Sequence, residues 1–111
     1  MKFAFLIFKY FPYGGLQRDM LRIARQLVNL GHQVDIYTIS WEGDRPPADI
    51  GVRVIPTRGL RNYVRYENFI RRAQAQIAAQ GYDLSVGFNR MSGLDVHFAG
   101  DPCFAEKMHA N

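Results

Sequence analysis

The sequence of 111 residues contains a single cysteine, Cys103, so it cannot form an internal disulfide. One thiol fits a reducing compartment such as the cytoplasm better than the disulfide scaffold of a small secreted protein. No apolar run approaches the roughly 20 residues that a membrane-spanning helix needs. The short run at residues 3–8 ends at Lys9 without a small-residue cleavage site, so we expect a buried strand and not a signal sequence.

Several motifs of nucleotide and metal sites are also missing. The fingerprint Gly-x-Gly-x-x-Gly and the P-loop ending Gly-Lys-Ser/Thr do not occur, which argues against a nicotinamide cofactor or a Walker-type site. His32, His97 and His109 are scattered, and there is neither His-Glu-x-x-His nor a cysteine pair, so no metal site is expected. No base-reading module is recognisable, and nucleic acid is not expected as a partner.

What is present describes one globular α/β domain. With 48% hydrophobic and 14% aromatic residues, the chain can bury a core, and its length suits a single domain. Apolar runs and helical periodicity predict a Rossmann-like parallel sheet with flanking helices. The expected strands are residues 2–8, 33–39, 51–56, 84–88 and 96–99, and the expected helices are residues 16–30 and 66–79.

Ligands of open parallel sheets bind beyond the carboxyl ends of the strands, and the unusual residues gather in the loops there. Gly14 and Gly15 precede the first expected helix, whose start offers unpaired N–H groups and partial positive charge. We expect their amides to be free to meet a phosphate or a sugar; a plain loop-to-helix turn is the alternative. Asp19 is placed on the first turn of that helix, either to complement the helix dipole or to accept sugar hydroxyls.

Two further segments follow strands at the same edge. Asn89 and Arg90 belong to a polar loop that either contacts a ligand or only turns the chain. Asp101 precedes Pro102 and either binds a hydroxyl or caps a following helix. From the residues alone, these features indicate a ligand-binding α/β domain.

The whole excess of positive charge lies in residues 58–72. The formal charge of the chain is +4, and this segment has five arginines against Glu67, which is also +4, because 5 − 1 = 4. A solvated helix face is one interpretation, and a surface for anionic lipid headgroups or phosphorylated glycolipids is the other. The arginines are Arg58, Arg61, Arg65, Arg71 and Arg72.

Three blocks of the sequence resemble a known family. The first runs from Lys9 to Ala24 and contains Tyr-Phe-Pro-Tyr-Gly-Gly-Leu-Gln-Arg-Asp; the others are Ser40–Asp44, Ser-Trp-Glu-Gly-Asp, and Gly87–Val96. Their order and spacing are similar to those of bacterial lipopolysaccharide-core glucosyltransferases, which belong to family 4 of the retaining, two-domain GT-B glycosyltransferases. The similarity spans nearly all of the chain. One departure is Arg90-Met91-Ser92, where the family usually has Lys-Met-Pro.

The resemblance implies that residues 1–111 are the amino-terminal, acceptor-side half of a GT-B fold, truncated before the nucleotide-binding domain. It implies transfer of glucose from UDP-glucose to an inner-core heptose with retention, without a metal or cofactor, on the cytoplasmic face of the inner membrane. Gly14, Gly15 and Asp19 would contact the donor, Asn89 and Arg90 the acceptor, and Asp101 is a catalytic candidate. Since the diphosphate clamp would lie in the second domain, the 111-residue chain alone is expected to be inactive.

Three alternatives stay open on the sequence. The first is a non-catalytic module that binds a glycan or a nucleotide. The second is another family 4 enzyme with a different donor or acceptor. The third is a membrane-surface adaptor that uses the arginine-rich segment.

Overall fold

The computed structural model describes residues 1–59, 61–89, 91 and 94–97. In this part of the chain, five strands pair in parallel in the order β3-β2-β1-β4-β5. The predicted α/β fold class, a Rossmann-like parallel sheet, is therefore confirmed. The elements are β1 (Lys2–Tyr10), α1 (Gly15–Asn29), β2 (Gln33–Trp41), β3 (Ile50–Val54), α2 (Asn62–Gln80), β4 (Leu84–Gly87) and β5 (Val96–His97).

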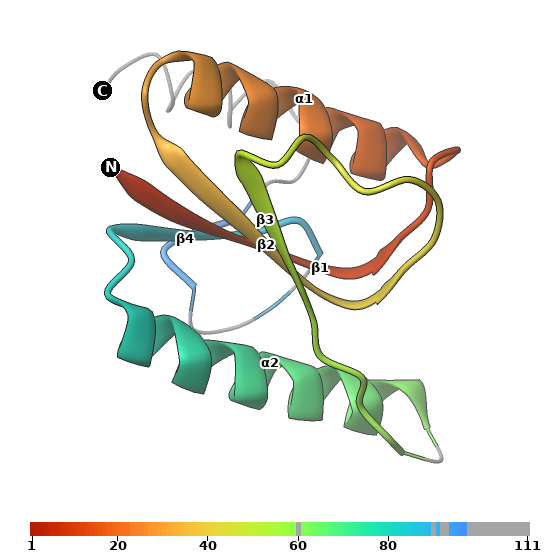
Figure 1. The fold of residues 1–111 in the computed structure, drawn as a ribbon. Helices are drawn as coiled ribbons and strands as arrows, with labels where there is room; N and C mark the ends of the chain where they lie inside the picture. The colour runs from red at the N-terminus through yellow and green to blue at the C-terminus, as the bar shows by residue number, and fades with distance from the viewer. Residues whose placement is uncertain (60, 90, 92–93, 98–111) are drawn as a thin grey trace.

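The two helices cover opposite faces of the sheet (Figure 1). One connects β1 to β2 and the other connects β3 to β4, as expected for the right-handed crossovers of parallel sheets. Since every strand runs in the same direction, all carboxyl ends lie at one edge of the sheet. Both helices begin at that edge, so their positive ends point to the place where such sheets bind ligands.

The end of β1 and the start of α2 differ from the predicted boundaries, because polar or exposed residues there give no apolar pattern. β1 continues through the exposed Lys9 because its pairing with β2 extends to the partners Tyr10 and Trp41. α2 begins at Asn62 and not at residue 66, because its first turn is largely exposed and has no apolar stripe to reveal it. Residues 98 and 99 of the last expected strand lie outside the described residues.

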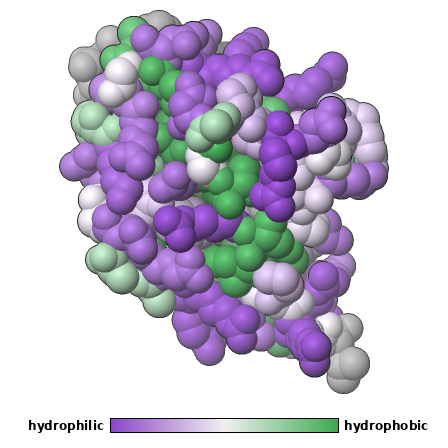
Figure 2. Space-filling model, in the orientation of Figure 1, coloured by the Kyte–Doolittle hydropathy of each residue, from purple (hydrophilic) through white to green (hydrophobic). Residues whose placement is uncertain are grey.

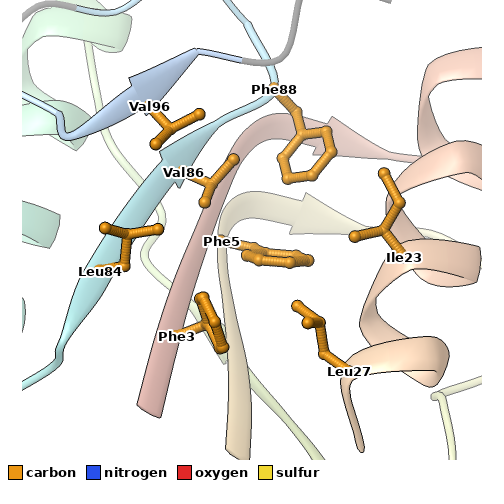
Figure 3. Close-up of a pocket in the computed structure, with 8 residues that line it drawn as sticks. All are labelled: Phe3, Phe5, Ile23, Leu27, Leu84, Val86, Phe88 and Val96. Carbon is orange, nitrogen blue, oxygen red and sulfur yellow. The ribbon is translucent and has the colours of Figure 1, made fainter. Parts of the chain in front are cut away.

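The face beneath α1 is a hydrocarbon core. Phenylalanines from β1 and from the end of β4 meet there, and the ring centroids of Phe5 and Phe88 lie 5.0 Å apart. A cavity of about 20 Å³ remains between this face and α1, and apolar side chains line it (Figure 3). Such a cavity holds about one water and offers it no polar partner, so it is a packing defect and not a ligand site. Its lining residues are Phe3, Phe5, Ile23, Leu27, Leu84, Val86, Phe88 and Val96.

The face beneath α2 combines apolar packing with a buried polar group. Phe69 of α2 is fully buried, and Tyr66 stacks on Phe8 with ring centroids 3.9 Å apart. At the amino end of the sheet, Tyr82 donates its hydroxyl hydrogen to Asp35, and the Tyr37 hydroxyl lies 3.0 Å from that of Tyr82. Burial and the hydrogen bond to Asp35 raise the pKa of Tyr82 far above its ordinary value of 10.0.

On the molecular surface, hydrophobic residues form an interrupted band between the two helices, surrounded by hydrophilic residues (Figure 2). Leu30, the last residue of the predicted helix 16–30, is 73% exposed because the helix ends at Asn29. Gly31 follows with a φ of +91°, a conformation that suits glycine and terminates the helix.

Candidate functional site

The start of α1 presents open backbone at the carboxyl edge of the sheet. Gly14 is the N-cap, with φ −86° and ψ 137°, and no side chain caps the helix. Within the described residues, the amides of Gly15, Leu16 and Gln17 donate no hydrogen bond to the backbone. The amide of Gly14 is different, since it donates a long bond of 3.4 Å to the carbonyl of Phe11. The expectation of two free glycine amides is therefore correct for Gly15 and wrong for Gly14.

The structure explains why position 14 is glycine. A Cβ at this position would overlap the ring of Phe11 and the amide group of Gln17. Gln17 is buried, and its Nε2 donates a hydrogen bond of 2.9 Å to the carbonyl of Lys9. The neighbouring Gly15 has open space where its Cβ would be. Gly14 thus permits close packing inside the loop, while Gly15 leaves room outside it.

Asp19 lies beyond the first turn of α1, which contains no acidic residue, so its predicted first-turn placement is wrong. The helix begins at Gly15, one residue before the predicted start, and Asp19 is four residues further on. Its Oδ1 accepts a hydrogen bond of 3.2 Å from Arg22, and both side chains are substantially exposed. Such a surface pair adds little stability and leaves the carboxylate accessible from solvent.

The loops after β1 and β2 hold each other in place. The rings of Tyr10 and Trp41 stack with centroids 3.7 Å apart, and the indole N–H donates a bond of 3.0 Å to the carbonyl of Asp44. Gly43 has a φ of +98°, and Pro12 packs close to the position that its Cβ would take. The glycine turn is therefore part of a braced unit, and the block Ser-Trp-Glu-Gly-Asp supplies the brace.

Asn89 connects the ends of β4 and β1. Its Oδ1 accepts a hydrogen bond of 2.8 Å from the backbone N–H of Phe8, so half of the carboxamide has a structural role. The Nδ2 group donates no hydrogen bond to another residue of the described part of the chain. The other two predicted site residues of this edge, Arg90 and Asp101, lie outside the described residues.

The five arginines lie on the segment before α2 and on α2 as far as its middle, and Arg72 donates a long bond of 3.5 Å to the carbonyl of Pro56. The segment Pro56–Gly59 folds back along α2, where Thr57 donates its hydroxyl hydrogen to the carbonyl of Arg65, 2.9 Å away. The side chain of Asn68 donates to the carbonyl of Arg58. These bonds place part of the positive charge near the start of α2, at the carboxyl edge of the sheet. Arg58, Arg61 and Arg65 lie there, whereas Arg71 and Arg72 lie near the middle of the helix.

Neither helix in the described part of the chain is long and apolar enough to cross a membrane. The same residues contain no group of three or more His, Cys, Asp or Glu side chains that could hold a metal ion. A polar cavity of about 190 Å³ lies against Arg25 and Asp49, where α1 ends and β3 begins. It is at the opposite edge of the sheet from the glycine turn and is separate from the predicted site.

The sequence interpretation missed the residues that shape the glycine turn. Gly14 is contacted or flanked by Phe11, Tyr13 and Gln17. The only sequence signal was the run Phe-Pro-Tyr before Gly-Gly, which contains Phe11 and Tyr13. It also missed the pair of Asp35 and Tyr82, because a carboxylate inside an alternating strand is normally expected to face water.

Comparisons with known proteins agree with this architecture. The profile of Glycosyltransferase Family 4 matches residues 13–100. The lipopolysaccharide glucosyltransferase WaaG of Escherichia coli K12 is 47% identical over 105 residues, which are 95% of this chain and 28% of WaaG. A crystal structure of WaaG, described as a glycosyltransferase involved in lipopolysaccharide biosynthesis, superposes with a TM-score of 0.84 at 43% identity. That alignment covers 98% of this chain and 29% of the other.

The chain thus spans little more than a quarter of the length of these relatives. The match in structure confirms the expected Rossmann-like half of a GT-B fold. The family profile includes the glycine turn, both helices and four of the five strands in full. The profile match over most of the chain, the sequence identity to WaaG and the structural match lead to one conclusion. The chain belongs to glycosyltransferase family 4.

Proposed function

We propose that the full-length protein transfers glucose from UDP-glucose to a heptose of the lipopolysaccharide inner core, with retention of the anomeric configuration. The proposal is supported by the 47% identity to WaaG, whose name describes a lipopolysaccharide glucosyltransferase. The structural observation behind it is the uncapped start of α1, where the Gly15 amide is open at the ligand-binding edge of the sheet.

The chemistry requires that negative charge on a departing diphosphate be stabilised. Oriented amides and the positive end of a helix provide this without reorganising during the reaction. In this proposal Gly14 and Gly15 form the donor-facing turn, and Asp19 accepts hydrogen bonds from the sugar. Asn89 offers its Nδ2 to the acceptor together with Arg90, and Asp101 is the catalytic candidate. No metal or cofactor is required.

The test is a transfer assay with purified full-length protein, UDP-glucose and inner-core lipopolysaccharide that lacks glucose. We expect the product to gain one hexose with an α-linkage, at the same rate with and without a chelator. UDP-galactose and GDP-mannose serve as donor controls. A β-linked product, or preference for another donor, would contradict the proposal. Binding of UDP-glucose without transfer would favour the non-catalytic alternative, and the 111-residue chain alone is expected to be inactive.

We further propose that the protein works on the cytoplasmic face of the inner membrane and attaches to anionic lipid through the arginine-rich segment. Four of its five arginines are exposed, namely all except Arg65. A basic residue near an anionic surface contributes about 1 kcal/mol, so Arg61→Gln is expected to weaken vesicle binding roughly fivefold. Arg25→Gln, which removes an equally exposed charge on α1, serves as the control.

The measurement is co-sedimentation with vesicles of phosphatidylglycerol and phosphatidylcholine, compared with phosphatidylcholine alone. Binding should occur only to the anionic vesicles and should decline as salt increases, because exposed charges are screened. Binding that is independent of salt, or equal losses for both variants, would contradict the assignment of this surface.

A further inference from the structure

Tyr13 is the most exposed large hydrophobic side chain of the part of the chain that the structure describes, with 74% of its surface accessible. It lies directly before the N-cap Gly14, at the carboxyl edge of the sheet. A single exposed aromatic residue is common on protein surfaces and has no meaning by itself. Its position therefore has to be weighed together with its contacts.

The ring of Tyr13 is supported from one side. It packs on the ring of Phe11, with centroids 4.7 Å apart and planes inclined by 31°. Phe11 in turn fills the space above Gly14 that a Cβ would otherwise occupy. The intervening Pro12 packs against Gly43 of the neighbouring loop. The tip of the turn is thus a braced aromatic pair and not a loose side chain.

The open amide of Gly15 lies two residues further along the chain. Two residues span at most about 7 Å, so one small ligand can contact both the ring and the amide. An aromatic ring has a negative face, which attracts the weakly positive C–H groups on the apolar face of a pyranose. A phosphate or hydroxyl of the same ligand would accept the hydrogen bond from the amide.

We infer that Tyr13 is a sugar-binding residue whose ring stacks on the pyranose of a substrate held at the start of α1. The inference rests on the proposed function, because it places a sugar substrate at this turn. The pyranose comes from either the donor or the acceptor, and the two sources are distinguished by which Michaelis constant changes.

The experiment compares three variants of the full-length enzyme with the wild type. Tyr13→Ala removes the ring, and Tyr13→Phe keeps the ring but removes the hydroxyl. Leu30→Ala truncates an equally exposed apolar side chain, 73% accessible, at the opposite end of α1. Initial rates are measured with UDP-glucose varied at fixed acceptor, and then with acceptor varied at fixed UDP-glucose. Melting temperatures are measured for all four proteins.

Tyr13→Ala is expected to raise KM for one sugar substrate about tenfold, which corresponds to about 1.4 kcal/mol of binding. An increase for UDP-glucose identifies the donor sugar, and an increase for the glycolipid identifies the acceptor sugar. Tyr13→Phe should keep both KM values within about twofold of those of the wild type, and Leu30→Ala should leave both KM values unchanged. All three variants should keep the melting temperature of the wild type. Three results would overturn the inference: unchanged KM values for Tyr13→Ala, an equal loss in Tyr13→Phe, or a matching loss in Leu30→Ala.

Calorimetric titration with UDP-glucose and with the glycolipid separates this inference from the proposed function. A wild-type protein that transfers no glucose, but whose affinity for either ligand drops about tenfold in Tyr13→Ala, would refute the function and retain the stacking role. A wild-type protein that transfers glucose normally, with unchanged kinetics and affinities in Tyr13→Ala, would refute the stacking role alone.

Discussion

The core beneath α1 consists of aromatic and aliphatic side chains, whereas the face beneath α2 also buries a carboxylate and two tyrosine hydroxyls. The carboxyl edge shows a parallel contrast. α1 starts at two glycines, of which Gly15 has a free amide, and α2 starts beside long arginine side chains. Neither helix has a side-chain cap, so the difference comes from the residues around each start.

The contrast indicates two kinds of recognition at one edge. Glycines let a small ligand approach backbone amides closely, and the hydrocarbon core beneath α1 anchors the helix that carries those amides. Arginines on long side chains suit a broad anionic surface whose geometry is less defined. In the proposed enzyme, the glycine turn would bind the sugar substrate and the arginines would attach the protein to the membrane.

The largest effect is expected from adding a side chain at Gly14, which tests whether the shape of the glycine turn matters for transfer. Gly14→Val in the full-length enzyme would displace Phe11 and pull Gln17 away from the carbonyl of Lys9. Because the turn would no longer present its amides correctly, we expect kcat/KM to drop at least about 100-fold, equivalent to about 2.7 kcal/mol. Steady-state transfer assays measure this effect.

Gly15→Ala is the matched variant for folding, since its Cβ would meet open space. Its melting temperature should remain that of the wild type, while that of Gly14→Val should be lower because overpacking costs about 1–3 kcal/mol. Wild-type activity in Gly14→Val would show that the shape of this turn does not matter for transfer.

The buried polar group beneath α2 gives the next largest effect. Tyr82→Phe removes the hydroxyl that donates to Asp35 and leaves a buried carboxylate without that partner. The expected loss is about 1–3 kcal/mol in the free energy of unfolding, measured in urea at pH 8. Tyr66→Phe is the control, because Tyr66 stacks on Phe8 through its ring, and it should change stability by less than about 0.5 kcal/mol. Equal effects of the two variants would argue against a special role for the pair.

The same tyrosine predicts a pH dependence. Burial and the bond to Asp35 raise the pKa of Tyr82 in the folded state, whereas an unfolded tyrosine ionises near 10.0. The folded state therefore keeps a proton that the unfolded state releases, and the contribution to stability is lost as the pH rises above 10. By pH 11 the wild type should lose up to about 1 kcal/mol more than Tyr82→Phe. The free energy of unfolding of both proteins is measured in urea between pH 8 and 11, and an equal change with pH in the two proteins would contradict this prediction.

Patterns of hydrophobicity predicted the α/β class and the apolar stripe of α2, because a parallel sheet needs continuous apolar strands and amphipathic helices. They could not place the start of α2, where exposed side chains give no periodic signal. They also gave no sign that β2 is buried on both faces and holds Asp35 inside. A buried carboxylate depends on a partner 47 residues away, and no local pattern contains that information.

At the candidate site, the glycines could be predicted because a Gly-Gly pair before a helix has a local meaning. Which of the two amides is free could not be predicted, because the Gly14 amide donates a hydrogen bond to the carbonyl of Phe11 within the turn around Pro12. The structural role of Asn89 was also hidden, because its partner on β1 is 81 residues earlier in the chain.

The smallest effect concerns the cavity beneath α1, which Val86→Ile is expected to fill. The side chain of Val86 points into this space together with those of Phe5 and Leu84 (Figure 3). Filling about 20 Å³ at about 24 cal/mol per Å³ should raise the free energy of unfolding by about 0.5 kcal/mol, measured in urea. Ser85→Thr adds a methyl group at the neighbouring position, whose side chain faces the opposite side of the strand and bonds Asp95, and it should not stabilise the protein. If Val86→Ile destabilises, the added methyl group does not fit this space, and the hydrocarbon face is already fully packed.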